Sequence, residues 1–190
     1  MSPLILNVEA LTLSDQQFYQ FCQDNPDLQF ERNAQGELIV MSPTGGETGN
    51  RNLEIGYQLQ SWSRQNSLGI AFDSSTGFKL PNGAERSPDA AWVTMAKWQS
   101  LKHQEQRGFV PLCPDFVIEL RSPSDSLKRL QEKLQEYREQ GTQLGWLIDR
   151  QQQRVEIYRP HQAVEILERP RQLSGETVLV GFTLDLTTIW

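Results

Sequence analysis

The segment that most constrains this chain is the run from Pro114 to Asp125, which reads Pro-Asp-Phe-Val-Ile-Glu-Leu-Arg-Ser-Pro-Ser-Asp. Read with the period of two of a β-strand, this run places apolar side chains on both faces. Such a strand is covered on both sides, as the central strands of α/β sheets are. Glu119 lies in the middle of it. A carboxylate buried there costs on the order of several kcal/mol unless it is paired, protonated or bound to a cation.

Length and composition predict an ordinary globular domain. The chain has 190 residues, of which 37% are hydrophobic and 22% charged, and its formal net charge of −6 argues against a broad basic surface for nucleic acid. Cys22 and Cys113 have no metal-ligand spacing. The sequence has no run of about 18 apolar residues and its N-terminus does not read as a secretory signal, so we expect a cytoplasmic protein with no membrane partner.

The order of predicted elements mixes strands and helices. Ser14 and Gln17 form a capping-box pattern at the start of a helix, and Gly141 marks the end of another. The predicted helices span 14–25, 47–65 and 125–140, and the predicted strands span 28–32, 37–41, 69–72, 78–80, 89–93, 114–121, 144–149, 154–158, 164–167 and 177–180. We therefore expect an α/β (α+β) fold, a mixed central sheet flanked by helices, with an N-terminal helix and β-hairpin.

Two carboxylates at strand positions are the candidates for chemistry. If their strands are neighbours, Asp89 and Glu119 converge, and Mg²⁺ is typically held by one or two carboxylates plus water and phosphate oxygens. Arg121 lies two residues after Glu119 and hence on the same face. The spacing alone favours a second, purely structural interpretation, in which Glu119 pairs with Arg121 or another basic residue and Asp89 caps a turn before its strand.

Four ordered segments carry a resemblance to a known family. They are Arg86-Ser-Pro-Asp-Ala-Ala-Trp-Val93, Pro114–Asp125, Lys133-Leu-Gln-Glu-Tyr-Arg-Glu-Gln-Gly141 and Trp146-Leu-Ile-Asp149. Together they closely resemble the Uma-two family, restriction-endonuclease-like proteins of the PD-(D/E)XK superfamily, long classed as a domain of unknown function. The run 36–47 is similar to the N-terminal hairpin and loop of that family, and the resemblance covers roughly residues 10–160.

The resemblance implies a single restriction-endonuclease-like domain over residues 1–190, with a nuclease-like α-β-β-β-α-β core at about 45–160. It also implies a metal-dependent endonuclease that hydrolyses phosphodiester bonds in DNA, with Mg²⁺ (or Mn²⁺) as the cofactor. Asp89 and Glu119 match the two acids of the superfamily motif. Nuclease-like folds are often dimeric, so a homodimer is expected.

The motif lysine is replaced in this sequence. Arg121 stands in its place, and arginine stays charged and is a poor proton donor or acceptor. The family often supplies a lysine from the following helix, and Lys133 matches that role. The alternative is that Lys133 is a solvated partner of a glutamate on its own helix, such as Glu136 or Glu132. Glu47, before the preceding helix, is the expected third acid and metal ligand, with Glu54 as its alternative.

Two other functions stay open at this point. In the first, the nuclease fold has lost catalysis with its motif lysine and serves as a DNA- or protein-binding module. In the second, the chain is an interaction protein that does not contact nucleic acid, which the acidic net charge favours.

Overall fold

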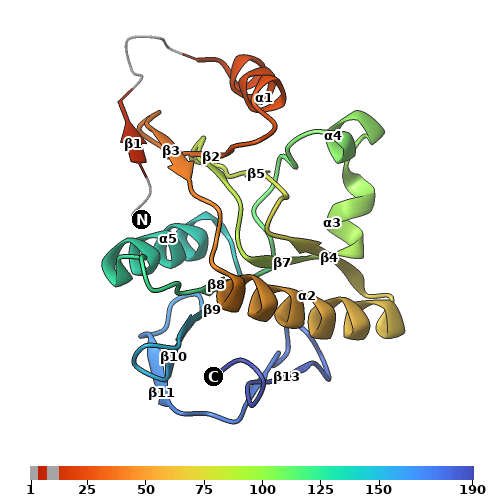
Figure 1. Cartoon of the computed structure of the whole chain (residues 1–190). Helices are drawn as coiled ribbons and strands as arrows, with labels where there is room; N and C mark the ends of the chain where they lie inside the picture. Colours follow the sequence, from red (N-terminus) through yellow and green to blue (C-terminus); the bar gives the residue numbers. More distant parts are fainter. Residues whose placement is uncertain (1–3, 8–12) are drawn as a thin grey trace.

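The computed structural model describes residues 4–7 and 13–190 (Figure 1). Its main sheet has six strands in the order β11-β10-β9-β8-β7-β4. These strands are β4 (Gly69–Asp73), β7 (Ala90–Thr94), β8 (Phe116–Leu120), β9 (Leu144–Asp149), β10 (Arg154–Tyr158) and β11 (Glu165–Glu168). β8 and β9 run parallel, and the other neighbours run antiparallel. The predicted mixed central sheet is confirmed.

The parallel pair of strands is joined by α5 (Leu127–Gln140), as the strand–helix–strand pattern predicts. Every residue of β8 and β9 is buried. A Cβ atom on Gly145 would lie 2.8 Å from Cδ1 of Leu134, so glycine at this position lets α5 pack closely on β9. Gly141 ends the helix with φ +117°, in the left-handed region that glycine tolerates best.

Helices α5 and α2 (Gly46–Asn66) pack on opposite faces of the main sheet. On the α2 side the core joins side chains of the helix, the sheet and the C-terminal segment, including Ile55, Leu59, Trp62, Phe116, Ile118, Phe182 and Ile189. On the α5 side it joins Val117, Leu134, Tyr137 and Leu147. A charged side chain on β8 that faces α5 is therefore shielded from solvent.

The N-terminal part forms a second, smaller sheet in the order β1-β3-β2-β6-β5, with α1 packed on it (Figure 1). Its elements are β1 (Leu4–Leu6), α1 (Asp15–Asp24), β2 (Gln29–Arg32), β3 (Leu38–Met41), β5 (Phe78–Lys79) and β6 (Glu85–Arg86). The predicted N-terminal helix and hairpin are confirmed, and Ser14 caps α1 with Gln17 as expected. Figure 1 shows α5 beneath this sheet.

The remaining elements are short: α3 (Met95–Ser100), α4 (His103–Arg107), β12 (Gln172–Ser174) and β13 (Thr183–Asp185). The strand predicted at 177–180 is wrong, because this segment turns and the Leu179 amide donates to the carbonyl of Gly175 at 2.8 Å. Trp190 donates to the carbonyl of Pro170, so the C-terminal segment packs on its own chain. Within the described residues, no helix is long and apolar enough to cross a membrane.

Candidate functional site

Glu119 and Asp89 face each other across adjacent strands. β7 begins at Ala90, one residue later than predicted, and Ala90 pairs with Ile118 in the antiparallel register. Asp89 is therefore the next residue opposite Glu119, and paired residues of antiparallel strands project from the same face. The structure thus brings the two expected acids to the same end of the sheet, where α5 contacts Glu119 and α2 contacts Asp89.

Two groups hold Asp89 in a fixed orientation. The side-chain amide of Asn52 on α2 donates to Oδ1 at 2.8 Å, and the backbone N–H of Leu120 donates to Oδ2 at 2.7 Å. Burial raises the pKa of Asp89, and the Leu120 N–H and nearby Lys133 oppose that rise. The Oδ1 atom of Asn52 is buried and accepts no hydrogen bond from the described residues.

Lys133 reaches Glu119 from the first half of α5. Its Nζ lies 2.7 Å from Oε1 of Glu119, 2.7 Å from Oε1 of Glu31 and 3.2 Å from the carbonyl of Ser87. Only 10% of its side chain is exposed. Burial alone would lower the pKa of Lys133, but the two carboxylates outweigh burial and raise it above its ordinary value. Lys133 is therefore an ammonium group shared between two acids.

Glu31, on β2, is a member of this cluster that the sequence did not reveal. Its carboxylate accepts from the Ser87 N–H at 2.9 Å and lies 3.1 Å from the guanidinium of Arg86, in addition to the contact with Lys133. Burial raises the pKa of Glu31, but Lys133 and Arg86 lower it further, so the net shift is downward. Arg86 also binds Glu136 of α5 at 2.6 Å.

Glu119 carries the least compensated charge of the cluster. Burial raises its pKa to about 8, with Lys133 opposing the shift and Asp89 and Glu31 adding to it. Nζ of Lys133 lies 2.7 Å from Oε1 of Glu119, so the ammonium group and this buried carboxylate form a close ion pair.

The charge balance and the donor atoms fit a divalent cation. The cluster consists of four acidic and two basic side chains, those of Glu31, Asp89, Glu119, Glu136, Arg86 and Lys133. When every one of these groups is ionised, the cluster has an excess of two negative charges. Mg²⁺ prefers oxygen ligands. Asp89 and Glu119 supply carboxylate oxygens, and the side chain of Asn52, which contacts Asp89, adds an amide oxygen that accepts no hydrogen bond from the described residues.

Glu47 does not join this pair. Its side chain is 79% exposed at the first turn of α2 and lies 3.3 Å from Arg150. Among the residues that the structure describes, no three His, Cys, Asp or Glu side chains are grouped so that they could hold a metal ion. Glu54, the alternative, accepts from Gln58 of the same helix. At the position facing Asp89, α2 presents Asn52 instead.

Arg121 lies just beyond the end of β8 and pairs with a different acid from the one expected. Its guanidinium is 2.8 Å from the fully buried carboxylate of Asp149 at the end of β9, and it also donates to the carbonyl of Asp125. The expected pairing of Arg121 with Glu119 is therefore wrong. The reason is geometric: the neighbouring parallel strand brings Asp149 to Arg121, while Lys133 occupies the space beside Glu119.

Comparison with known proteins agrees with this architecture. A family model described as "Putative restriction endonuclease", that of Uma2, matches residues 15–187. Among solved structures, the chain is similar to a putative nuclease belonging to DUF820 from Anabaena variabilis ATCC 29413, with a TM-score of 0.72 and 21% sequence identity. The match covers 84% of this chain and 88% of that one, and at this identity it shows the fold alone.

A search of curated proteins returned no match. The family model spans nearly the whole described chain, including both β2 with Glu31 and α5 with Lys133. The resemblance found in the four sequence segments is thereby confirmed, and this chain belongs to the Uma2 family of restriction-endonuclease-like proteins.

Proposed function

We propose that this protein is a Mg²⁺-dependent endonuclease that hydrolyses phosphodiester bonds in DNA. Its family and its fold are those of nucleases. The observation that carries the proposal is the placement of Asp89, Glu119 and Lys133 at one end of the sheet, because two acids and one ammonium group are the functional groups of a PD-(D/E)XK site. Lys133 replaces, from a helix, the motif lysine that is missing at Arg121.

In this proposal Asp89 and Glu119 hold the ion, and Mn²⁺ is an alternative to Mg²⁺. When bound, such an ion polarises the phosphate and lowers the pKa of a coordinated water. Lys133, as a cation with three N–H donors, orients the attacking water or stabilises negative charge on the phosphate oxygens. Glu31 keeps Lys133 in place, because it is the second carboxylate that contacts the Lys133 ammonium group. Asn52 keeps Asp89 oriented through its hydrogen bond.

The direct test is cleavage of supercoiled plasmid DNA in Mg²⁺ or Mn²⁺. Glu119→Gln keeps the size of the side chain and removes its charge, and Lys133→Met keeps its length and removes its charge. We expect each substitution to lower the cleavage rate about 100-fold or more. Lys128→Met is the matched control, since Lys128 is on the same helix with its side chain 84% exposed. Cleavage that survives Glu119→Gln unchanged would disprove the assignment.

Metal binding is tested apart from cleavage by calorimetric titration with Mg²⁺ or Mn²⁺. Wild type is expected to bind, and Asp89→Asn is expected to lose binding because one of the two carboxylates is gone. Equal titration curves for the two proteins would remove the metal site from the proposal even if cleavage were observed.

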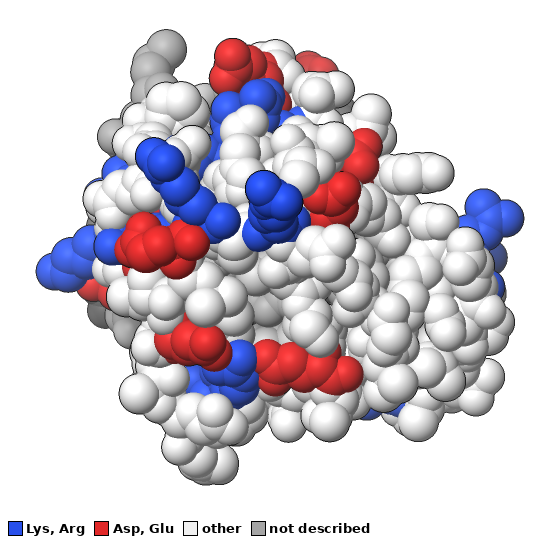
Figure 2. Space-filling model, turned by 90° about the horizontal axis from the view of Figure 1, so that it is seen from below, with Lys and Arg blue, Asp and Glu red and all other residues white. Residues whose placement is uncertain are grey.

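A second candidate function is a nuclease fold that binds DNA or protein without cutting. The pairing of Arg121 with Asp149 favours it, because the residue at the position of the motif lysine is held away from Glu119. Figure 2 shows one face of the molecule, where acidic and basic groups are intermixed among uncharged ones. The described residues drawn there form no continuous basic strip, so DNA contact on that face would be weak. Salt-sensitive DNA binding without metal-stimulated cleavage would identify this alternative.

The proposal includes a homodimer, because two copies of the site are needed to cut both strands of a duplex in one encounter. Light scattering after size-exclusion chromatography measures the mass directly. A mass of 21.8 kDa, that of one chain, at all concentrations tested would exclude the dimer.

A further inference from the structure

The outer face of α2 carries two large apolar side chains side by side. Helix α2 buries its other face on the main sheet, and Leu53 and Tyr57 project away from the sheet with exposed fractions of 72% and 65%. They are four residues apart, so they are neighbours on the helix surface. Adjacent apolar side chains that the described residues leave uncovered indicate a surface for contact with another molecule.

These two residues are the centre of a longer stripe that is symmetric in chemical character. Between its first turn and its last, the exposed residues of α2 are Glu47, Asn50, Leu53, Tyr57, Gln60 and Arg64. They recur at the spacings of three and four that define one face of a helix. A charged residue stands at each end, followed inward by a polar residue and then by an apolar one. Each pair taken inward from the two ends is centred within one residue of position 55.

This order makes the stripe complementary to itself in one orientation. When two copies of α2 pack antiparallel about a two-fold axis at position 55, Glu47 of one copy comes near Arg64 of the other at both ends. In the middle, Leu53 of one copy meets Tyr57 of the other. Opposite charges and apolar groups are thereby matched. Parallel packing would instead bring each charged residue beside its own copy, which repels.

Uncharged surface continues beside the stripe. A groove of about 320 Å³ lies between the second half of α2 and the turn before β13, and its lining residues, which include Tyr57, Ser61, Gln65 and Phe182, are all uncharged. Val180, in the same turn, is 61% exposed. The chain has a net charge of −6, so two copies repel each other in most orientations. A contact between copies is therefore favoured where the surface is uncharged.

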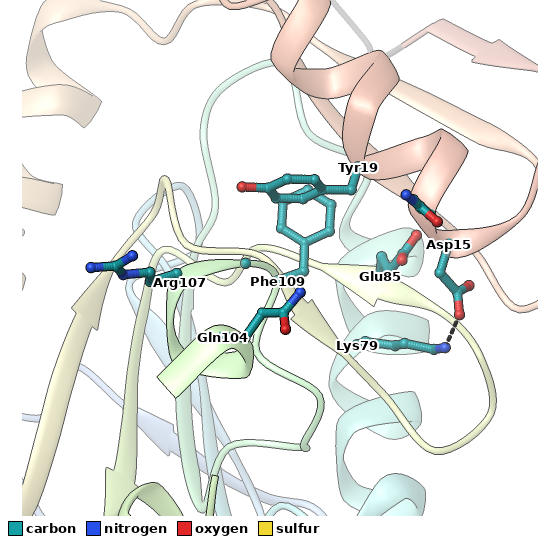
Figure 3. Close-up of a pocket in the computed structure, with 9 residues that line it drawn as sticks. Asp15, Tyr19, Lys79, Glu85, Gln104, Arg107 and Phe109 are labelled. Carbon is teal, nitrogen blue, oxygen red and sulfur yellow. Dashed lines mark hydrogen bonds and ion pairs between the residues drawn. The ribbon is translucent and has the colours of Figure 1, made fainter. Parts of the chain in front are cut away.

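The hollow between α1 and α4 shows a contrasting kind of surface (Figure 3). Charged groups of both signs line it, and they have partners within the chain. Lys79 pairs with Asp15, which the dashed line in Figure 3 marks, and Glu85 pairs with Arg32. A partner that covered this hollow would have to desolvate these charges, which is costly. Covering Leu53 and Tyr57 has no such cost.

We propose that α2 is the interface of a homodimer in which the α2 helices of two copies pack antiparallel, with Leu53 of each against Tyr57 of the other. This inference names the contact surface of the dimer in the proposed function and rests on that dimer. The same helix carries Asn52, which contacts Asp89, so the interface adjoins the candidate active site. A nucleic acid does not fit the stripe, because Arg64 is its only basic residue.

The central contact is tested by Tyr57→Lys, with light scattering after size-exclusion chromatography over a range of concentrations. Wild type is expected to have the mass of two chains. The substitution places a charge in the apolar centre of the interface twice, so we expect the dissociation constant to rise about 100-fold or more. Ile166→Lys is the matched control, since Ile166 is an exposed apolar residue of β11, and it leaves the mass unchanged. Circular dichroism checks that each variant is folded.

The antiparallel arrangement is tested by exchanging the charges at the ends of the stripe. Arg64→Glu sets two acids opposite each other at both ends, and we expect the dimer to weaken about tenfold. Adding Glu47→Arg to this variant restores opposite signs and should return the dissociation constant to within about threefold of wild type. Within one copy these residues are about 25 Å apart along the helix, so recovery requires a contact between copies.

The inference and the proposed function fail in different ways. A wild type that has the mass of one chain at all concentrations overturns the dimer and this interface together. A dimer that Tyr57→Lys and Arg64→Glu leave as tight as wild type overturns the interface alone. Plasmid cleavage in Mg²⁺ is measured separately. A dimer that both variants weaken but that does not cleave DNA supports the interface and rejects the nuclease activity.

Discussion

The small sheet has a buried glutamate on each of its two sides, Glu31 of β2 and Glu85 of β6, and the two carboxylates differ in the partners that they contact. On the α5 side, Glu31 contacts Lys133, Arg86 and the Ser87 N–H, and its pKa is lowered. On the α1 side, Glu85 pairs with one cation of the described residues, Arg32, and burial raises its pKa to about 7. Both side chains are 3% exposed, so burial does not distinguish them. The number of partners decides which carboxylate stays charged, and each of the following experiments tests that conclusion.

The largest effect is expected from Lys133→Met. It leaves Glu31 and Glu119 without their shared cation in a buried site, which costs about 3–5 kcal/mol of the free energy of unfolding. Urea unfolding at neutral pH measures it. Lys128→Met, at an exposed position of the same helix, should stay within about 0.5 kcal/mol of wild type. An equal, small effect of both substitutions would mean that the cluster contributes nothing to stability.

The difference between the two glutamates is tested by comparing the free energies of unfolding of Glu31→Gln and Glu85→Gln. Glu31→Gln removes a charge that two cations contact, and we expect a loss of about 2–3 kcal/mol. Glu85→Gln removes a charge that burial disfavours, and we expect a change of less than about 1 kcal/mol. Urea unfolding of both variants gives the two values. If Glu85→Gln proves the more damaging, the number of partners is not what separates the two sides.

The sequence could predict one side of this comparison only in part. Glu119 was found because an acid in an apolar strand is conspicuous, and Lys133 because the family resemblance implies a lysine from the following helix. Glu31 has no such signal. It precedes Arg32 at the end of a four-residue hairpin strand, where charged residues usually face solvent, and only the docking of α5 shows that it is buried.

The environment of Glu85, on the α1 side of the small sheet, could not be predicted from the sequence for a related reason. β6 has two residues, too few for a period-two pattern, so the pairing of Glu85 with Arg32 across β6 and β2 has no trace in the local sequence. The misplaced strand at 177–180 shows the converse. Thr-Val-Leu-Val has strand-like composition, yet Leu179 and Phe182 are buried through a turn that begins at Gly175. Tertiary packing decided both cases.

The pH dependence of stability should have opposite signs at the two glutamates. Glu85, surrounded by Arg32, Asp15 and Lys79, has a folded pKa of about 7 against 4.5 for the unfolded chain. The contribution of Glu85 to the stability of the folded state is fully present below pH 4.5 and is lost as the pH rises through about 7. Wild type should therefore lose stability relative to Glu85→Gln between about pH 5 and about pH 8.

Glu31 has a pKa below its ordinary value of 4.5. Its contribution to the stability of the folded state is therefore present above pH 4.5 and is lost as the pH falls below that value. The stability gap between wild type and Glu31→Gln should therefore shrink on acidification. Urea midpoints across this pH range, with Glu132→Gln as a control for an exposed glutamate of α5, give both slopes. Parallel slopes for the two variants would contradict the assigned pKa directions.

The smallest effect on stability is expected from Asn52→Ala, which tests whether the α5 side depends on orientation as well as on charge. The substitution removes one hydrogen bond to Asp89 and should cost about 1 kcal/mol of the free energy of unfolding. It also removes an amide oxygen next to Asp89 that accepts no hydrogen bond from the described residues, so Mg²⁺ affinity should fall about 10- to 100-fold. Gln60→Ala, exposed on the same helix, is the control. A loss of stability with unchanged metal affinity would show that Asn52 only supports the fold, and that charge alone governs the site.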